Sequence, residues 1–301
     1  MSLVARLFLG EDGKLRHIWR AAIFYGLTFW ALPYLLNPAI GWVFTQLRLS
    51  PGFTAGLIAF VEAQYFVIAL IPTALFALYE RRRVDSYGMT VGRALKLATL
   101  EGILAGIVMV GAVGIGMYAL GGMQVHGLAT TGAALAFSAL AWAGANICVG
   151  ITEEFWFRGY FLQSLWRSIG FWPAALVVAA VFAAIHYFNK PGENIWDVIT
   201  LVSFSLLCSY SVLKTGTLWF AVGFHGAFDF MQLAVIGTPN GGQVPVGRLL
   251  DTGFNGPAWL TGGTLGTEAS FLVYPMTVLV WLYIWWRYRP AAATLSEPPP
   301  P

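Results

Sequence analysis

Three ionisable residues stand close together in an otherwise apolar part of the sequence. Glu153 and Glu154 are adjacent, and Arg158 follows four residues after Glu154. The preceding residues, 102–152, contain no Asp, Glu, Lys or Arg. A charge at the centre of a membrane helix costs about 2.5–3.5 kcal/mol on insertion scales, so a cluster of three needs a reason beyond solubility. Paired carboxylates suit general acid and base catalysis, and we therefore expect chemistry on a scissile bond.

Helical spacing points the two glutamates in different directions. Glu154 and Arg158 are four residues apart, so they share one helical face. Asn146 and Gly150 extend this face by two turns. Such a stripe must face a bundle interior or a water-filled cavity, whereas Glu153 lies about 100° further round the helix. A buried ion pair that only fixes helix packing is the alternative interpretation, but it leaves the second glutamate unexplained.

A histidine in the next apolar stretch is expected at the same depth as the glutamates. If the chain reverses near Gly170, Glu153 lies 17 residues before the turn and His186 lies 16 residues after it. At 1.5 Å per residue, both lie about 24–26 Å from the turn. We therefore expect Glu153 and His186 to approach within hydrogen-bond or one-water reach. The alternative is a histidine that only packs between helices.

A further polar pair, His225 and Asp229, is again four residues apart on one helical face. Measured from the turn signal at residues 214–216, His225 lies only about 14 Å up its helix. This depth agrees with that of the glutamates only if the turn is itself recessed. The sequence leaves this point open.

Composition places the chain among membrane proteins. Hydrophobic residues make up 58% of the 301 residues, charged residues only 10%, and the mean hydropathy is +0.69. Soluble domains contain about 25% charged residues. The net charge of +3 is too small to indicate nucleic-acid binding. Cys148 and Cys208 lie in apolar runs without metal-type spacing, which is typical of small core residues.

Eight apolar stretches reach or approach the roughly 20 residues that a helix needs to cross a bilayer. They are Ala21–Phe44, Phe53–Tyr79, Gly102–Leu120, Ala129–Trp166, Phe171–Phe188, Trp196–Leu213, Thr217–Ile236 and Ser270–Trp286. We predict an all-α fold, a polytopic membrane bundle of about eight transmembrane helices over residues 21–288. Residues 1–20 are predicted to be a cytoplasmic segment, and residues 289–301 a Pro-rich cytoplasmic tail.

The basic residues predict the orientation of this bundle. With eight crossings, thirteen of the 17 Lys and Arg residues fall on the side of the termini. Only Arg48, Lys190 and Arg248 fall on the other side, and Arg158 remains in the membrane. Because cytoplasmic loops carry an excess of Lys and Arg, both termini are expected in the cytoplasm of a cell (inner) membrane. The Gly-rich segment 237–268 is then an outer loop.

The three polar motifs, taken together, resemble those of the CPBP group of intramembrane proteases. This group includes the CAAX prenyl endopeptidases and bacteriocin-processing and immunity (Abi-like) proteins. The matching motifs are Glu153-Glu154-x-x-x-Arg158, Phe182-x-x-x-His186 and His225-x-x-x-Asp229. Each motif alone is a weak signal, but three in order on successive apolar helices are specific. The resemblance covers residues 130–236.

The resemblance implies a peptidase that acts on a peptide or lipidated-protein substrate in contact with membrane lipid. In the family, the first glutamate and the first histidine are held to activate a water, which here implies Glu153 and His186. Glu154 and Arg158 are then expected to support the substrate or the transition state. It is unfavourable for two adjacent carboxylates in a low dielectric to be ionised at the same time. One of them is then suited to act as general base, while Arg158 keeps the other ionised.

The resemblance also implies that the second histidine and its partner stabilise the oxyanion. These residues are His225 and Asp229 in this sequence. The CAAX endopeptidases have an Asn at the second position, which can donate a hydrogen bond to an oxyanion. An ionised Asp cannot donate, so Asp229 is more plausible as the residue that orients His225.

Two other interpretations stay open. No cofactor is expected, but a divalent metal held by Glu153, His186 and His225 could activate the water, although no His-Glu-x-x-His pair favours zinc. A non-catalytic immunity or transport protein is the second alternative, because carboxylates and histidines in membranes also relay protons. The sequence shows no inverted repeats that would favour a transporter. Glu62 is not assigned to any role.

Overall fold

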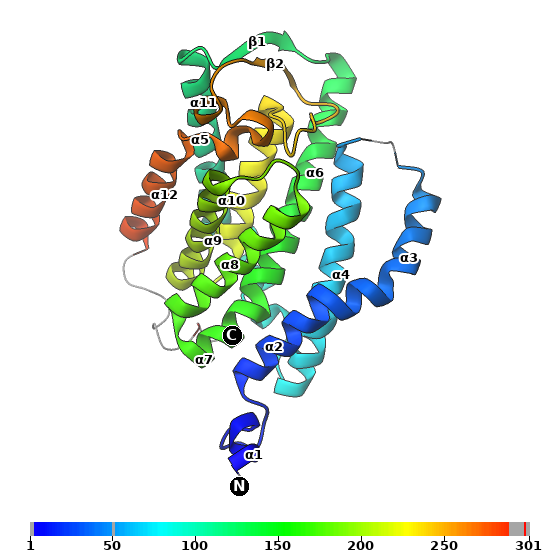
Figure 1. Ribbon diagram of the computed structural model, residues 1–301, viewed down its shortest axis with the longest axis vertical. Coiled ribbons are helices and arrows are strands. Elements are labelled where there is room, and N and C mark those ends of the chain that lie inside the picture. The colour runs from blue at the N-terminus through cyan, green and yellow to red at the C-terminus, as the bar shows by residue number, and fades with distance from the viewer. Residues whose placement is uncertain (1–2, 50–51, 289–297, 299–301) are drawn as a thin grey trace.

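Helices dominate the computed structural model of the protein, which describes residues 3–49, 52–288 and 298 (Figure 1). The α-helices are α1 (Leu3–Phe8), α2 (His17–Gly26), α3 (Leu32–Leu47), α4 (Ala55–Glu80), α5 (Leu97–Ala119), α6 (Gly132–Trp156), α7 (Leu162–Ile169), α8 (Phe171–Asn189), α9 (Ile195–Thr215), α10 (Trp219–Asp229), α11 (Ala258–Thr261) and α12 (Val273–Arg287). The π-helical segments are η1 (Leu27–Ala31), η4 (Phe157–Phe161) and η5 (Phe230–Ile236), and the 3₁₀ turns are η2 (Val84–Ser86), η3 (Val91–Arg93) and η6 (Gly263–Ala269).

Eight helical stretches in the described part of the chain are long and apolar enough to cross a membrane. This finding confirms the predicted helical membrane bundle, and each stretch overlaps one of the eight predicted from sequence. Four of them are composite: α2, η1 and α3 run on continuously, as do α6, η4 and α7, and α10 and η5, while the last stretch joins η6 to α12 through residues 270–272. The predicted tail, residues 289–301, lies outside the described residues except for Pro298.

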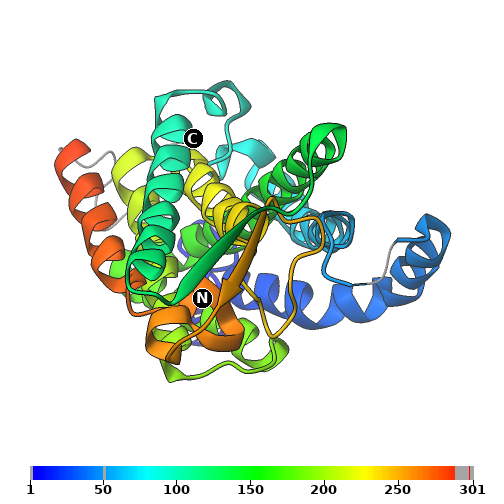
Figure 2. The same ribbon diagram turned by 90° about the horizontal axis from the view of Figure 1, so that it is seen from above.

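The loops gather at two opposite ends of the bundle (Figure 1). At one end, strands β1 (Met123–Leu128) and β2 (Leu250–Phe254) form an antiparallel ribbon that the sequence analysis did not anticipate. Figure 2 looks down on this ribbon, which crosses above the helices. We call this end the ribbon end, and the opposite end, which carries α1 and the connection 81–96, the α1 end.

Helix α10 lies in the middle of the bundle because glycines let neighbouring helices approach its backbone closely. A Cβ atom built on Gly150 of α6 would lie 2.5 Å from the carbonyl oxygen of Val222. A Cβ on Gly226 of α10 would lie 2.8 Å from the carbonyl oxygen of Asn146. Real Cβ atoms do not approach carbonyl oxygens so closely, so only glycine fits at either position. The close approach brings the motif of α10 against that of α6.

The turn between α9 and α10 is covered by the connection 81–96. The backbone N–H of Leu218 and the hydroxyl of Thr217 both donate to the carbonyl oxygen of Gly88, at 2.9 and 3.0 Å. The indole N–H of Trp219 donates to the carbonyl oxygen of Thr90 at 2.9 Å. Because this connection packs beneath the turn, α10 begins inside the bundle. The turn is therefore recessed. A recessed turn is what allows the histidine motif to lie at the same depth as the glutamates.

The helix of the first motif is not regular throughout. The sequence predicted a single helix over Ala129–Trp166, whereas the structure divides it into α6, η4 and α7. The division falls at Gly159, whose ψ of −115° is not helical. A second π-helical segment, η5, directly follows Asp229. Such π-helical segments occur often at functional sites, where they change the direction of side chains.

Replacing Gly150 by alanine should destabilise the protein by about 1–3 kcal/mol, because the methyl group must push α10 away from α6. Gly144 is a matched control on the same helix, since a Cβ there would meet no atom within 4 Å. Thermal unfolding in detergent should show a lower melting temperature for Gly150→Ala and an unchanged or higher one for Gly144→Ala. Equal melting temperatures would contradict the close packing described here.

Candidate active site

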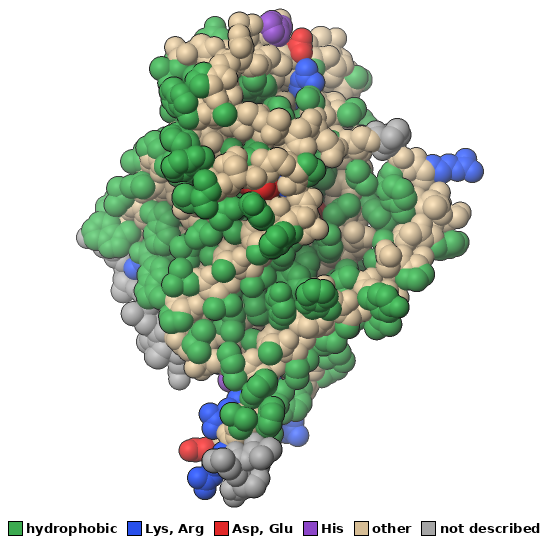
Figure 3. All heavy atoms as spheres, viewed as in Figure 1, with side chains coloured by type: hydrophobic (Ala, Val, Ile, Leu, Met, Phe, Trp, Pro, Cys, Tyr) green, Lys and Arg blue, Asp and Glu red, His purple; other side chains and the backbone are tan. Residues whose placement is uncertain are grey.

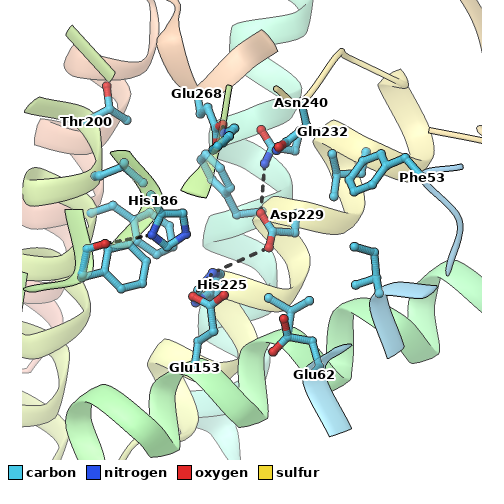
Figure 4. Close-up of a pocket in the computed structure, with 18 residues that line it drawn as sticks. Phe53, Glu62, Glu153, His186, Thr200, His225, Asp229, Gln232, Asn240 and Glu268 are labelled. Atoms are coloured by element: carbon cyan, nitrogen blue, oxygen red, sulfur yellow. Dashed lines mark hydrogen bonds and ion pairs between the residues drawn. The ribbon is translucent and has the colours of Figure 1, made fainter. Parts of the chain in front are cut away.

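The six residues selected from the sequence meet in one region of the bundle, and Figure 4 shows four of them, Glu153, His186, His225 and Asp229. Their elements are α6 (Glu153, Glu154), η4 (Arg158), α8 (His186) and α10 (His225, Asp229). Four of them, Glu153, His186, His225 and Asp229, line a cavity of about 160 Å³. The other two, Glu154 and Arg158, are completely buried behind it. The cavity has room for several water molecules, each of which occupies about 30 Å³ in the liquid.

His225 is the centre of this arrangement. Its Nδ1 atom lies 2.8 Å from Oε1 of Glu154 and, because a carboxylate only accepts, Nδ1 carries a hydrogen atom. Its Nε2 atom lies 3.6 Å from Oδ2 of Asp229 and 3.8 Å from Oε2 of Glu153. Three carboxylates therefore surround one imidazole ring. This contact settles the question of depth that the sequence left open, since His225 lies level with both glutamates.

A buried network holds Glu154 in place. The guanidinium group of Arg158 donates to Oε1 of Glu154 at 3.2 Å and to the hydroxyl of Ser205 on α9 at 2.7 Å. The same guanidinium lies 4.9 Å from the ring centre of Phe182 on α8. The predicted pair on one helical face is thus present, and it links α6 to α8, α9 and α10. Sequence analysis did not identify Ser205, because a serine in an apolar helix carries no distinctive signal.

His186 lies across the cavity from Glu153 (Figure 4). Its Nδ1 atom lies 2.9 Å from the carbonyl oxygen of Phe182, one turn earlier. A carbonyl oxygen can only accept, so Nδ1 carries the hydrogen and Nε2 is free to accept one. Glu153 and His186 line the same cavity, but no direct hydrogen bond joins them among the described residues. Their approach through one water stays a prediction.

Asp229 is held by a residue that sequence analysis missed. The amide nitrogen of Gln232 donates to Oδ1 of Asp229 at 2.9 Å. The Gln232 side-chain oxygen in turn accepts from the hydroxyl of Thr267 at 2.9 Å. The remaining oxygen of Asp229 faces Nε2 of His225. A polar residue three positions after Asp229 in an apolar helix was the signal that could have identified Gln232.

Glu62, which the sequence analysis left unassigned, also lines the cavity from α4. Its side chain is buried, and its Oε2 atom has no hydrogen-bond partner among the described residues. Glu62 is contacted through its backbone instead, because the hydroxyl of Thr152 donates to the carbonyl oxygen of Glu62 at 3.1 Å. The structure therefore adds a fourth carboxylate to the region around His225.

At the ribbon end, the cavity is bordered by charged side chains. Lys190, which follows α8, forms ion pairs with Glu193 and Glu268. Asp197 lies beside them and is completely buried. Removal from water, and then the contact with Asp197, raise the pKa of Glu193 to about 8. The Lys190 ion pairs join the start of α9 to η6, which caps the cavity.

The sequence analysis proposed Glu153, His186 and His225 as the ligands of a possible divalent metal. The ligand atoms of these three residues do not form a compact group among the described residues. The group that does so is Glu193, Asp197 and Glu268, whose carboxylate oxygens lie within 4.8 Å of one another. The metal dependence of the chemistry stays a question for experiment.

Two further hollows continue from the cavity to the side of the bundle. The first, of about 340 Å³, shares Glu153 and His186 with the cavity. The second, of about 690 Å³, lies between η1 and α8 and is lined mainly by aromatic and aliphatic side chains. The two hollows share the side chains of Tyr65, Trp156, Ile185 and Asn189. A path therefore leads from the polar cavity to the side of the bundle, with polar side chains in its inner part and mainly apolar ones in its outer part.

Comparison with known proteins adds an independent finding. Residues 135–231 match a family described as type II CAAX prenyl endopeptidase Rce1-like, and all six candidate residues lie within the match. A relative from Bacillus subtilis (strain 168), uncharacterized protein YyaK, is 26% identical over 153 residues. The matched region covers 49% of this chain and 48% of the relative, so the chain spans about half the length of the curated relative it matches. The family match confirms the resemblance predicted from the three motifs.

Arg158→Ala should lower the free energy of unfolding by about 3–5 kcal/mol, because it leaves Glu154 charged and buried without its partner. The matched control is Arg83→Ala, which breaks the ion pair with Asp85 at a side chain that is 85% exposed. Water screens such exposed pairs, so the control should unfold like the unmodified protein. A melting temperature of Arg158→Ala within error of the control would show that the buried pair does not stabilise the fold.

Proposed function

The chain contains a domain of the Rce1-like type II CAAX prenyl endopeptidase family, and from this premise we propose an intramembrane endopeptidase whose hydrolytic water is activated by Glu153 and His186. Membership of this family implies a peptidase and a peptide substrate. The observation that carries the proposal is the convergence of the three motifs on one cavity. We propose that the substrate is a lipidated or membrane-associated peptide.

The chemistry of the cavity supports this assignment of the water. One carboxylate oxygen of Glu153, Oε2, has no hydrogen-bond partner among the described residues, and Nε2 of His186 is free to accept. A water between them would donate its hydrogens to both groups, which leaves an oxygen lone pair for a peptide carbonyl. Glu153 then removes a proton as general base during attack. The same carboxyl group returns a proton to the leaving amine.

His225 is the proposed donor to the oxyanion. Because Nδ1 of His225 is held by Glu154, its Nε2 atom points towards the cavity. When both ring nitrogens are protonated, as the surrounding carboxylates favour, the Nε2–H group can donate to negative charge that develops on the carbonyl oxygen. Glu154 stays an acceptor because Arg158 neutralises it. In this proposal Asp229 orients the ring of His225, and it does not donate to the oxyanion itself.

The apolar path between η1 and α8 supports a membrane-associated substrate. Its walls include the rings of Phe29, Trp30 and Trp156, and it joins the polar cavity through Tyr65 and Ile185. Burial of apolar surface contributes about 25 cal/mol per Å², so an alkyl or isoprenoid chain in this path would add to binding. The peptide attached to such a chain would reach Glu153.

The distribution of basic residues supports an orientation with both termini in the cytoplasm. The α1 end carries most of the Lys and Arg residues, whereas the ribbon end carries Arg48, Lys190 and Arg248. Positive charge in short loops is retained on the cytoplasmic side. We therefore propose a multi-pass protein of the cell membrane with the ribbon end outside.

Glu153→Gln, His186→Ala and the double variant should each lose about 10²–10⁴-fold in kcat, and the two losses should not add, because residues that act as a unit are not additive. The assay uses purified protein with a panel of prenylated and unprenylated peptides. Thr200→Ala is the control, since Thr200 lines the cavity but donates its hydroxyl to the carbonyl oxygen of Trp196. Unchanged turnover of Glu153→Gln on a verified substrate would refute the proposal.

The same assay with a chelator tests the metal alternative. We expect activity to persist, because the proposal assigns the water to side chains. Loss of activity that one added metal restores would replace this mechanism with a metal-activated one.

Asp229→Asn should retain substantial activity. The amide oxygen of asparagine can still face Nε2 of His225 with its partial negative charge, so the orientation of the ring is kept. Asp229→Ala removes that contact and should lower kcat by more than the asparagine variant does. Equal and severe losses in both variants would mean that the negative charge of Asp229 is required and that its role is not orientation.

A further inference from the structure

The cavity lies at the ribbon end of the bundle. Four lining residues, Phe53, Lys190, Asn240 and Glu268, come from connections or short turns at that end. These connections contact one another, since the backbone N–H of Val246 donates to the carbonyl oxygen of Phe53 at 2.9 Å. None of the cavity-lining residues comes from the connections at the α1 end. Of the two ends of the described bundle, only the ribbon end borders the polar cavity.

Exposure of the site residues follows the same direction. The side chains of Glu153 and Asp229 are 18% and 16% exposed. The pair behind them, Glu154 and Arg158, is 0% exposed. Figure 3 shows acidic atoms inside a hollow on an otherwise largely apolar face, on the side of the molecule towards the ribbon. Exposure of the site residues thus falls from the cavity side to zero at Glu154 and Arg158.

The α1 end is closed beneath the site. Below Arg158, the hydroxyl groups of Tyr87 and Tyr160 each donate to Glu80 at 2.9 Å. Arg20 completes this contact with an ion pair to Glu80, also at 2.9 Å. Both tyrosines are completely buried, as is the neighbouring Trp166. This aromatic layer, together with the connection 81–96, separates the polar cavity from the α1 end.

Charge identifies which aqueous compartment each end faces. The described Lys and Arg residues of the α1 end are Arg6, Lys14, Arg16, Arg20, Arg81, Arg82, Arg83, Arg93, Lys96, Arg167, Lys214 and Arg287. The ribbon end has Arg48, Lys190 and Arg248, and two of these three are ion-paired, Lys190 with Glu268 and Arg248 with Asp251. So strong an asymmetry places the α1 end in the cytoplasm.

We propose that the catalytic cavity opens to the non-cytoplasmic side of the membrane, and that the substrate is a peptide segment presented at that outer face. An exported peptide, or the outer juxtamembrane segment of an anchored protein, has this chemistry. A segment that entered along the bundle from the α1 end would have to cross the aromatic layer formed by Tyr87, Tyr160 and Trp166, so the lateral path between η1 and α8 is its other route. The statement about the substrate rests on the proposed function, whereas the direction of the opening does not depend on it.

Labelling of single cysteines tests the direction of the opening. In a background where Cys148 and Cys208 are replaced by alanine, Asn240→Cys places a thiol at the mouth of the cavity. Leu95→Cys places one at the α1 end, where the side chain is 90% exposed. A membrane-impermeant maleimide added to intact cells, or to spheroplasts if an outer membrane is present, should label Asn240→Cys fully. Leu95→Cys should be labelled only after lysis. The reverse pattern overturns the proposal.

Hydrolysis in sealed vesicles of known orientation tests the substrate statement. A peptide that the purified enzyme cleaves should be cleaved by right-side-out vesicles, and cleavage should disappear in intact inverted vesicles and return when detergent opens them. Vesicles that carry Glu153→Gln provide the background rate. Cleavage only by inverted vesicles overturns this inference and leaves the endopeptidase intact. Absence of cleavage by the purified enzyme, with outside labelling of Asn240→Cys, instead refutes the proposed function and leaves the opening in place.

Discussion

The contact between Glu154 and the pair Arg158 and His225 is the interaction on which the rest of this structure depends. All three side chains lie inside a membrane bundle, where an unpaired charge costs several kcal/mol. Glu154 accepts hydrogen bonds from both Arg158 and His225 through the same oxygen atom. The position of α10 along α6 is therefore fixed by the length of one hydrogen bond. Packing of the other helices has to respect that register. Ser205 extends the network to α9 and gives the guanidinium a further acceptor.

Small residues make this register possible. Gly150 and Gly226 let the backbones of α6 and α10 touch one turn away from the glutamates. Without such contact, His225 could not reach Glu154 at 2.8 Å. In a bilayer there is little hydrophobic driving force between helices, and close approach of small residues supplies the packing instead. The glycines and the charged residues therefore depend on one another. The glycines allow the short distance between α6 and α10, and the hydrogen bond between His225 and Glu154 requires it.

The arrangement also separates two faces of the site. Glu154 and Arg158 lie on the dry side and act as a fixed support, whereas Glu153 and Asp229 face the cavity. Adjacent residues of a helix differ in direction by about 100°, which is why two neighbouring glutamates can serve such different surroundings. The π-helical segments η4, which contains Arg158, and η5, which follows Asp229, set the direction in which each helix leaves the site. Above the cavity, Lys190 holds η6 as a cap through Glu268.

Much of the protein could be predicted from its sequence, because membrane insertion leaves strong local signals. The lengths of the apolar runs predicted eight spans, and the helical spacing predicted that Glu154 and Arg158 pair. The three motifs were sufficient to indicate the family that residues 135–231 match. These features depend on neighbours within a few residues along the chain, and helical periodicity allows such neighbours to be identified from the sequence.

Tertiary structure alone decided how the motifs meet. Counting residues from the turn at 214–216 set His225 too low, since no local signal shows that the connection 81–96 packs beneath that turn. Ser205 and the β1–β2 ribbon were missed for the same reason. Each depends on a contact between segments far apart in the sequence. Periodicity within one helix determines which side of that helix is polar, whereas the depth and partner of a polar group depend on how the helices are stacked.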